Sequence, residues 1–373
     1  MLIKNANVFL PDGRFSIRDL RFEDTIRELG HFPNEEGLDA AGLYLVPGFI
    51  DLHTHGAMGC DFSDGDAEGL PRMARHYARH GVTSFLATTM TLPLNTLCAA
   101  ARTIADFAPD ACMSSCAGMF MEGPFLSHAK RGAQAAKHLH APDAEFFDRV
   151  DEASGRRVRM LTVAPEEPGA LALIRHAAER CVVAVGHTVA GYDEAAAGFR
   201  AGASQLTHLY NGMNALLHRA PGPIGAGMDA GAYAELICDG LHVHPAAVRA
   251  AFRLFPERVV LISDSLRCAG MPEGDYSLGG QPITLRQGRC TLRGSDTLAG
   301  SVITVHDAVR NAVRFGVDLE TAVAAGTHNP ARALRLENAC GFLRPGLPAD
   351  LVLLDASLSI RAVYLRGREL RAD

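Results

Sequence analysis

Residues 66–90 read DAEGLPRMARHYARHGVTSFLATTM, and the two halves of this stretch follow different periodicities. In the first half, apolar residues recur at the spacing of a helix, which predicts a helix that stops at Gly81. The apolar positions are Leu70, Met73, Ala74 and Tyr77. The second half, VTSFLATTM, is an apolar run of the kind that forms a buried strand. Because another apolar run precedes the helix at residues 45–53, the stretch predicts a β-α-β unit.

The same alternation continues along the chain. Six further apolar runs follow, several of them separated by Ala-rich amphipathic segments such as YDEAAAGFRAG: CMSSCAGMFMEG, RRVRMLTVAPE, RCVVAVGHT, ASQLTHLYN, AELICDGLHV and ERVVLISDS. Eight strands that alternate with helices favour a closed (β/α)₈ TIM-like barrel. The alternative, a doubly wound open sheet, is disfavoured because the chain lacks a GxGxxG turn.

The two ends of the chain have a different character. Residues 1–45 are polar, turn-rich and strand-like, and residues 343–373 again read as short strands. We therefore expect both termini to pair into one small β-sandwich domain. The barrel would then occupy residues 46–342.

Composition narrows the class of protein. The chain has 373 residues, 48% of them hydrophobic and 21% charged, with no apolar run near 18 residues, so we expect a soluble protein and no membrane partner. Its net charge of −6 without a basic run indicates no nucleic-acid partner. Nine cysteines without a CxxC motif and an N-terminus unlike a signal peptide favour the cytoplasm.

Polar residues directly follow five of the eight predicted strands, at the end where barrel enzymes assemble their sites. They are His53, His55, Glu122, His187, His208 and Asp264. Any one of them alone is more often a structural residue, but six at equivalent positions form a pattern. Imidazole and carboxylate ligands without clustered thiolates suit Zn²⁺ or Fe²⁺, so we expect a divalent metal site.

Several blocks of sequence also occur in a fixed order: PGFIDLHTHG, EGPFLSHAKRGAQ, GHTVAGYDEAAAGFRAGASQLTHLYNGM, CDGLHV, LISDS and RPGLPADLVLLD. Together they resemble the N-acetylglucosamine-6-phosphate deacetylase family of the amidohydrolase superfamily. The HxH and PADLVL signatures mark only the superfamily, whereas the EGPF, GHT, THLYNGM and DGLHV blocks are more specific. The resemblance covers nearly the whole chain. It implies metal-dependent hydrolysis of the acetamide of N-acetyl-D-glucosamine 6-phosphate to D-glucosamine 6-phosphate and acetate.

The resemblance also implies roles for the metal ligands. Glu122, His187 and His208 would bind the principal metal. His53 and His55, with Asp264 nearby, could support a second ion, so one or two ions of Zn²⁺ or Fe²⁺ per subunit are expected. Asp264 would act as general base and acid, taking a proton from the attacking water and delivering it to the leaving amine.

For the substrate, the resemblance places the sugar phosphate against Asn211, Gly212, Arg219 and His242. In the family this arginine reaches the site of the neighbouring subunit, which implies a homodimer. The acetyl and sugar side would be lined by Gly132, Ala133 and Gln134, with Leu298 in the segment TLAGS close to the sugar. Some relatives carry His where this chain has Gln134, and a glutamine cannot titrate, so a carbonyl-polarising role there is in question.

Three other functions remain open at this point. The galactosamine 6-phosphate epimer would need the same metal and phosphate chemistry. A cyclic-amide or nucleobase amidohydrolase is disfavoured because the fourth predicted strand, MLTVAPE, lacks the lysine of hydantoinase-like relatives. A non-catalytic protein on the same barrel is disfavoured because every ligand and the acid/base residue are present.

Overall fold

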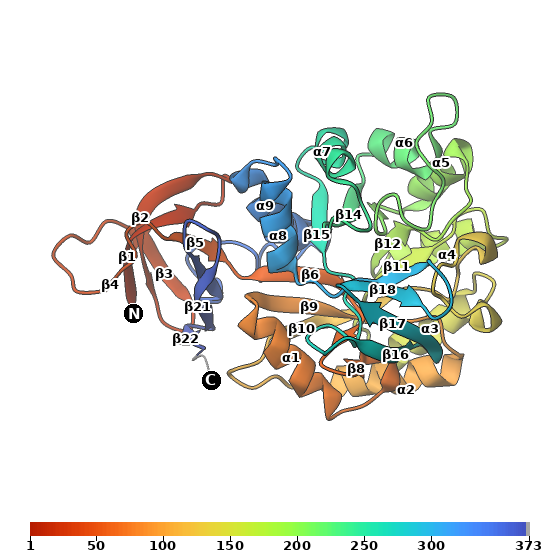
Figure 1. The fold of residues 1–373 in the computed structure, drawn as a ribbon, viewed down its shortest axis with the longest axis horizontal. Helices are drawn as coiled ribbons and strands as arrows, with labels where there is room; N and C mark the ends of the chain where they lie inside the picture. The colour runs from red at the N-terminus through yellow and green to blue at the C-terminus, as the bar shows by residue number, and fades with distance from the viewer. Residues whose placement is uncertain (371–373) are drawn as a thin grey trace.

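The computed structural model describes residues 1–370 and contains a barrel with a smaller sheet beside it (Figure 1). Eight strands form the barrel sheet, in the same order as in the sequence, and all pairs are parallel. The strands are β6 (Phe49–Thr54), β9 (Val82–Thr89), β10 (Ser115–Met121), β11 (Val158–Val163), β12 (Val182–Val185), β13 (Gln205–Leu206), β14 (Tyr233–Ile237) and β15 (Val259–Ile262). The predicted (β/α)₈ barrel is confirmed.

The first and last barrel strands meet through backbone hydrogen bonds. The amide of Asp264 donates to the carbonyl of His53 over 2.8 Å, and the amide of His55 donates to the carbonyl of Ser265 over 2.8 Å. Three of the four residues that join the two ends of the sheet are therefore predicted site residues, namely His53, His55 and Asp264.

Helices cover the outside of the barrel (Figure 1). The predicted helix after the first strand is α1, and its four apolar positions are buried. Side-chain caps mark other helix starts: Asp143 accepts from the amides of the first turn of α3, and Thr304 with Asp307 forms a capping box on α8. The helices are α1 (Gly69–Arg79), α2 (Leu94–Asp106), α3 (Ala144–Ala153), α4 (Ala170–Ala178), α5 (Tyr192–Ala201), α6 (Gly222–Asp229), α7 (Pro245–Leu254), α8 (Val305–Arg314), α9 (Leu319–Gly326) and α10 (His328–Ala333). Within residues 1–370, none of them is long and apolar enough to cross a membrane.

The smaller sheet combines strands from both ends of the chain. Its members are β1 (Leu2–Phe9), β2 (Phe15–Phe22), β3 (Ile26–Gly30), β4 (Leu38–Asp39), β5 (Tyr44–Pro47), β20 (Leu351–Leu354), β21 (Ile360–Leu365) and β22 (Arg368–Glu369). β5 lies between β1 and β20, so N-terminal and C-terminal strands share one hydrogen-bonded sheet around a separate apolar core. The division of the chain into a domain of residues 1–45 and 343–373 and a barrel domain of residues 46–342 stays our proposal.

A four-stranded antiparallel sheet is inserted between β15 and α8. Its strands are β16 (Gly274–Leu278), β17 (Gln281–Arg286), β18 (Arg289–Leu292) and β19 (Leu298–Gly300). Leu278, Ile283 and Cys290 pack against Leu266 and Cys268 of the loop that follows Asp264. Sequence analysis did not predict this sheet, because its strands are short, half-exposed and interrupted by glycines. The segment TLAGS contains β19.

Candidate active site

The six predicted metal ligands lie at the carboxyl ends of the barrel strands and converge on the barrel axis. All six are at least nine-tenths buried. Three of them adopt left-handed backbone conformations that non-glycine residues rarely take: φ is 48° at His187, 27° at His208 and 48° at Asp264. Such strained positions recur at functional sites, where the surrounding structure holds a side chain in one direction.

One group of ligands consists of Glu122, His187 and His208. Oε1 of Glu122 lies 3.0 Å from Nε2 of His187 and 2.9 Å from Nε2 of His208. The two histidine nitrogens are themselves only 3.0 Å apart. The three side chains thus direct their ligand atoms at one small volume.

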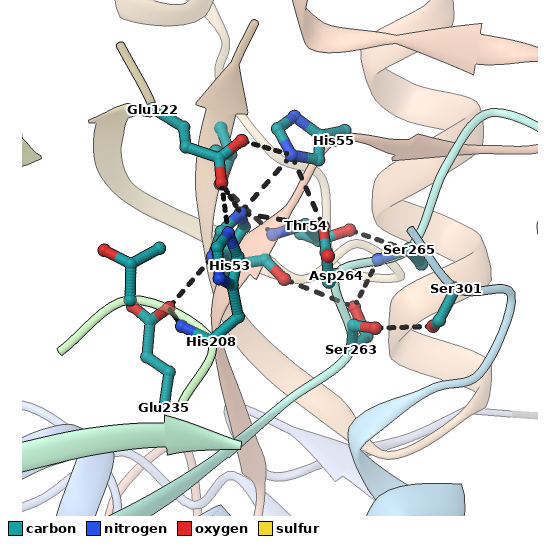
Figure 2. Close-up of polar contacts among 12 residues, drawn as sticks. His53, Thr54, His55, Glu122, His208, Glu235, Ser263, Asp264, Ser265 and Ser301 are labelled. Carbon is teal, nitrogen blue, oxygen red and sulfur yellow. Dashed lines mark hydrogen bonds and ion pairs between the residues drawn. The ribbon is translucent and has the colours of Figure 1, made fainter. Parts of the chain in front are cut away.

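The second group consists of His53, His55 and Asp264. Nε2 of His53 and Nε2 of His55 are 3.3 Å apart, and Oδ1 of Asp264 lies 3.6 and 3.4 Å from them. Glu122 touches both groups, because its Oε2 lies 3.1 Å from Nε2 of His55 (Figure 2). The carboxylate of Glu122 therefore lies within about 3 Å of imidazoles from both groups.

The hydrogen bonds behind the histidines decide whether a cation fits. Nδ1–H of His187 donates to the carbonyl of Lys130, and Nδ1–H of His208 donates to the carbonyl of Asn211. Nδ1–H of His53 donates to the carboxylate of Glu235. Each of these imidazoles therefore presents the unprotonated Nε2 to the centre. Lone pairs from nitrogen and carboxylate oxygen about 3 Å apart repel each other unless a positive charge lies between them, so the donor set fits a divalent metal.

The electrostatics favour a positive charge at the same place. Burial alone would lower the pKa of His55, but hydrogen bonds to Asp264 and Glu122 raise it to about 9. Burial alone would raise the pKa of Glu122, but the neighbouring His53 and His187 bring it well below its ordinary value. Asp264 behaves in the same way, because His53 and His55 outweigh its burial and lower its pKa. The carboxylates are therefore ionised and ready to hold a cation.

A cavity of about 360 Å³ opens above the ligands. It is lined by nearly all of the predicted site residues: His55, Glu122, Gly132, Ala133, Gln134, His187, His208, Asn211, Gly212, His242, Asp264 and Leu298. The lining also includes residues that sequence analysis missed, among them Arg289 and Asp296 of the inserted sheet. No motif marked these two residues, because a single Arg or Asp in a polar hairpin carries no signal of its own.

In the wall of the cavity, the carboxylate of Asp239 holds His242 in place. Nδ1–H of His242 donates to Oδ2 of Asp239 over 2.6 Å, and the backbone amides of Leu241 and His242 donate to Oδ1. This arrangement leaves Nε2 of His242 free for a ligand. Arg219 is different: it is exposed, does not line the cavity, and within residues 1–370 has no hydrogen bond or ion pair.

Gln134 has both ends of its amide occupied. Nε2 donates to Oε2 of Glu122 over 2.6 Å, and Oε1 accepts from the amide of Thr91 over 2.7 Å. Its carboxamide therefore orients a metal ligand as well as lining the cavity.

Glu235 is another residue at the centre that sequence analysis did not select. It lies in β14, is fully buried, and contacts His53. A signal was present, because a glutamate inside the apolar run AELIC is rarely buried without a partner.

Comparison with known proteins agrees with this geometry. The amidohydrolase family model matches residues 44–370. The chain belongs to the amidohydrolase family. The matched region contains all eight barrel strands and leaves out β1 to β4. Members of this family depend on a metal, and this amidohydrolase carries two groups of side chains that can hold one.

Individual relatives resemble this amidohydrolase over most of its length. An N-acetylgalactosamine-6-phosphate deacetylase of Escherichia coli O157:H7 is 39% identical over 331 residues, which cover 87% of each chain. An N-acetylglucosamine-6-phosphate deacetylase of Lysinibacillus sphaericus is 36% identical over 377 residues, covering 99% of this chain and 97% of the relative. Among solved structures, a mutant N-acetyl-D-glucosamine-6-phosphate deacetylase from Mycobacterium smegmatis in complex with N-acetyl-D-glucosamine-6-phosphate has a TM-score of 0.92 at 34% identity. That match covers 99% of this chain and 98% of the other.

Proposed function

We propose that this amidohydrolase removes the acetyl group from N-acetyl-D-glucosamine 6-phosphate by hydrolysis, releasing acetate and D-glucosamine 6-phosphate. The observation that carries the proposal is the cavity itself. Its lining holds residues of both ligand groups, Asp264 among them, together with His242 and Asn211, so a single ligand can contact all of them. Similarity to deacetylases of phosphorylated N-acetyl amino sugars over nearly the whole chain supports the same substrate class.

The metal centre in this proposal uses both groups of ligands. Glu122, His187 and His208 would hold the principal ion, and His53, His55 and Asp264 a second one, with Glu122 between them. Zn²⁺ and Fe²⁺ are the ions that suit these ligands. When bound, the metal supplies Lewis acidity, which makes a water molecule acidic enough to attack at neutral pH and withdraws electrons from the acetyl carbonyl.

Asp264 performs the proton transfers in this scheme. Its carboxylate is ionised, since its pKa is lowered, so it can accept a proton from the attacking water. The same group then returns the proton to the sugar amine as the C–N bond breaks. Positive φ at Asp264 and the bond from its amide to His53 hold the carboxylate beside the ligands.

Imidazole and amide donors in the cavity lining bind the phosphate in this scheme. His242 and Asn211 with the backbone at Gly212 supply donors from the same chain. Gly132, Ala133 and Gln134 line the acetyl and sugar side, with Leu298 facing them from β19. Arg219 lies outside its own cavity, and the same loop exposes Leu216 and Leu217, the latter to 57%. We therefore assign Arg219 to the phosphate of the neighbouring subunit in a cytoplasmic homodimer.

The test is acetate release by the purified protein supplied with Zn²⁺ or Fe²⁺. Three substrates are compared: N-acetylglucosamine 6-phosphate, unphosphorylated N-acetylglucosamine and N-acetylgalactosamine 6-phosphate. We expect turnover of the phosphorylated glucosamine and little from the unphosphorylated sugar. A folded, metal-loaded sample that releases no acetate from any of the three would contradict the proposal.

The galactosamine 6-phosphate is kept as the second candidate substrate for a specific reason. The E. coli relative with 39% identity is a deacetylase of that epimer, whereas the Lysinibacillus relative with 36% identity acts on the gluco epimer. The ratio of kcat/KM for the two phosphorylated sugars decides between them.

A further inference from the structure

Glu235 is a fully buried carboxylate directly behind the metal ligands. Its Oε2 accepts hydrogen bonds from Nδ1–H of His53 over 3.0 Å and from the backbone amide of His208 over 3.1 Å (Figure 2). Its Oε1 accepts from Nε2 of Gln205 over 2.8 Å. One side chain thus contacts a ligand from each of the two metal-binding groups.

The burial of this carboxylate requires a compensating charge. Within residues 1–370, its sole ion-pair partner is His53, and no lysine or arginine reaches it. An ionised carboxylate in an interior position costs several kcal/mol unless it is paired and hydrogen-bonded. A cation on the other face of His53 supplies the missing positive charge through the imidazole, as in carboxylate–histidine–metal arrangements.

We propose that Glu235 is a positioning residue for the His53–His55–Asp264 metal position. It accepts the Nδ1 proton of His53, fixes the ring, and directs the lone pair of Nε2 toward the ion. Glu235 does not touch the cavity, so it acts through His53 rather than on the substrate. This inference rests on the metal centre of the proposed function.

Gln205 makes a graded test possible. Its Oε1 has no hydrogen-bond partner. In Glu235→Gln, the amide of Gln205 can rotate and accept from the new amide, while the new carbonyl keeps the bond to His53. That variant removes the charge but keeps the acceptor. Glu235→Leu removes both.

The experiment titrates metal-free protein with Zn²⁺ in competition with a chelator, and reads out the affinity and number of ions per subunit. We expect Glu235→Leu to weaken the binding of one of two ions about 10–100-fold and Glu235→Gln to weaken it less. Binding of the other ion should be unchanged in Glu235→Gln, whose carbonyl still accepts from the amide of His208. Asp151→Asn is the matched control, because Asp151 is an equally buried carboxylate of α3 outside the site. Circular dichroism of each metal-free variant checks the fold.

A second variant, used as the starting protein, identifies which ion loses affinity when Glu235 is changed. In His55→Ala, which removes a ligand of the same position, Glu235→Gln should leave the affinity for the remaining ion within about two-fold, since that ion does not depend on His53. A ten-fold loss there would overturn the proposal, as would Zn²⁺ affinities in Glu235→Leu equal to those of the wild type. Wild-type protein that binds no Zn²⁺ would instead contradict the proposed function itself.

Discussion

Asp264 combines a catalytic assignment with an unusual backbone. Its φ of 48° lies in the left-handed region, and its amide bonds to the carbonyl of His53. Asparagine tolerates that region better than other non-glycine residues, so the carboxylate can be neutralised there without straining the chain. Asp264→Asn therefore removes the charge with little change to the backbone.

We expect Asp264→Asn to keep the fold and the principal ion at Glu122, His187 and His208, and to lower kcat about 10²–10⁴-fold because an amide cannot accept the proton of water. The measurement is kcat on the phosphorylated sugar beside the metal content of the same sample. Near-normal turnover would remove Asp264 from the proton transfers.

The barrel strands and the polar side chains that converge at their carboxyl ends could be predicted from the sequence because both signals are local. An apolar run that is followed closely by His187 or Asp264 predicts where a strand ends and which side chain lies at that end. The position of Glu235 on the inner face of β14 was not predictable in this way, because its partners His53 and Gln205 are distant in sequence. Nor was the inserted sheet, since β16 to β19 carry few apolar residues and gain their burial from the loop after Asp264.

Besides the residues that it contributes to the cavity lining, the inserted sheet contacts the site through the side chain of Gln281. Nε2 of Gln281 in β17 donates to the carbonyl of Ala133, next to Gln134 and through it to Glu122. The sheet also anchors Asp264, whose carbonyl accepts from the amide of Ser301 just after β19.

We expect Gln281→Ala to raise KM for the phosphorylated sugar about five-fold with a smaller effect on kcat, because loss of one hydrogen bond of about 1 kcal/mol loosens the wall of the cavity. Steady-state kinetics measure this effect. The control is Gln287→Ala in the exposed turn between β17 and β18. Equal KM values for the two variants would show that the contact does not shape the site.

At the scale of the whole molecule, His328 joins the barrel to the smaller sheet. Its ring stacks on Phe342 at 4.0 Å and on Phe9 of β1 at 4.6 Å. Burial, with a contribution from Arg332, lowers its pKa from 6.5 to about 3. The folded protein therefore holds His328 neutral where the unfolded chain would protonate it.

The sign of the pH effect follows from these values. Above pH 6.5, His328 is neutral in both the folded and the unfolded chain and does not make the free energy of unfolding depend on pH. As the pH falls from 6.5 toward 3, the unfolded chain takes up a proton that folded His328 does not, and the free energy of unfolding decreases by the order of a few kcal/mol. We expect His328→Phe, which keeps an aromatic ring but cannot titrate, to flatten the fall of Tm between pH 7 and 4.5. Parallel Tm curves for variant and wild type would contradict this assignment.

The proposed homodimer permits a test that needs two variants at once. Arg219→Ala should raise KM for the phosphorylated sugar roughly 10–100-fold, because one charge-assisted hydrogen bond to the phosphate is lost. If Arg219 serves the neighbouring subunit, a refolded equal mixture of Arg219→Ala and Asp264→Asn subunits has about a quarter of the wild-type sites intact, because half of the dimers carry one complete site. Activity of the mixture at low substrate is the readout. An average of the two parents would place Arg219 in its own subunit's site.

The hydrogen bond from the amide of Asp264 to the carbonyl of His53 also limits when the site can form during biosynthesis. The first ligands and the base are separated by more than half of the chain, and β5 cannot pair with β20 until the C-terminal strands exist. Pairings between residues so distant in sequence make folding slow, and the N-terminal strands stay unpaired with their C-terminal partners until those have been synthesised. A nascent chain arrested before β15 carries Glu122, His187 and His208 but lacks Asp264 and the last barrel strand, so the barrel that brings the two groups together closes only after β15 has been made.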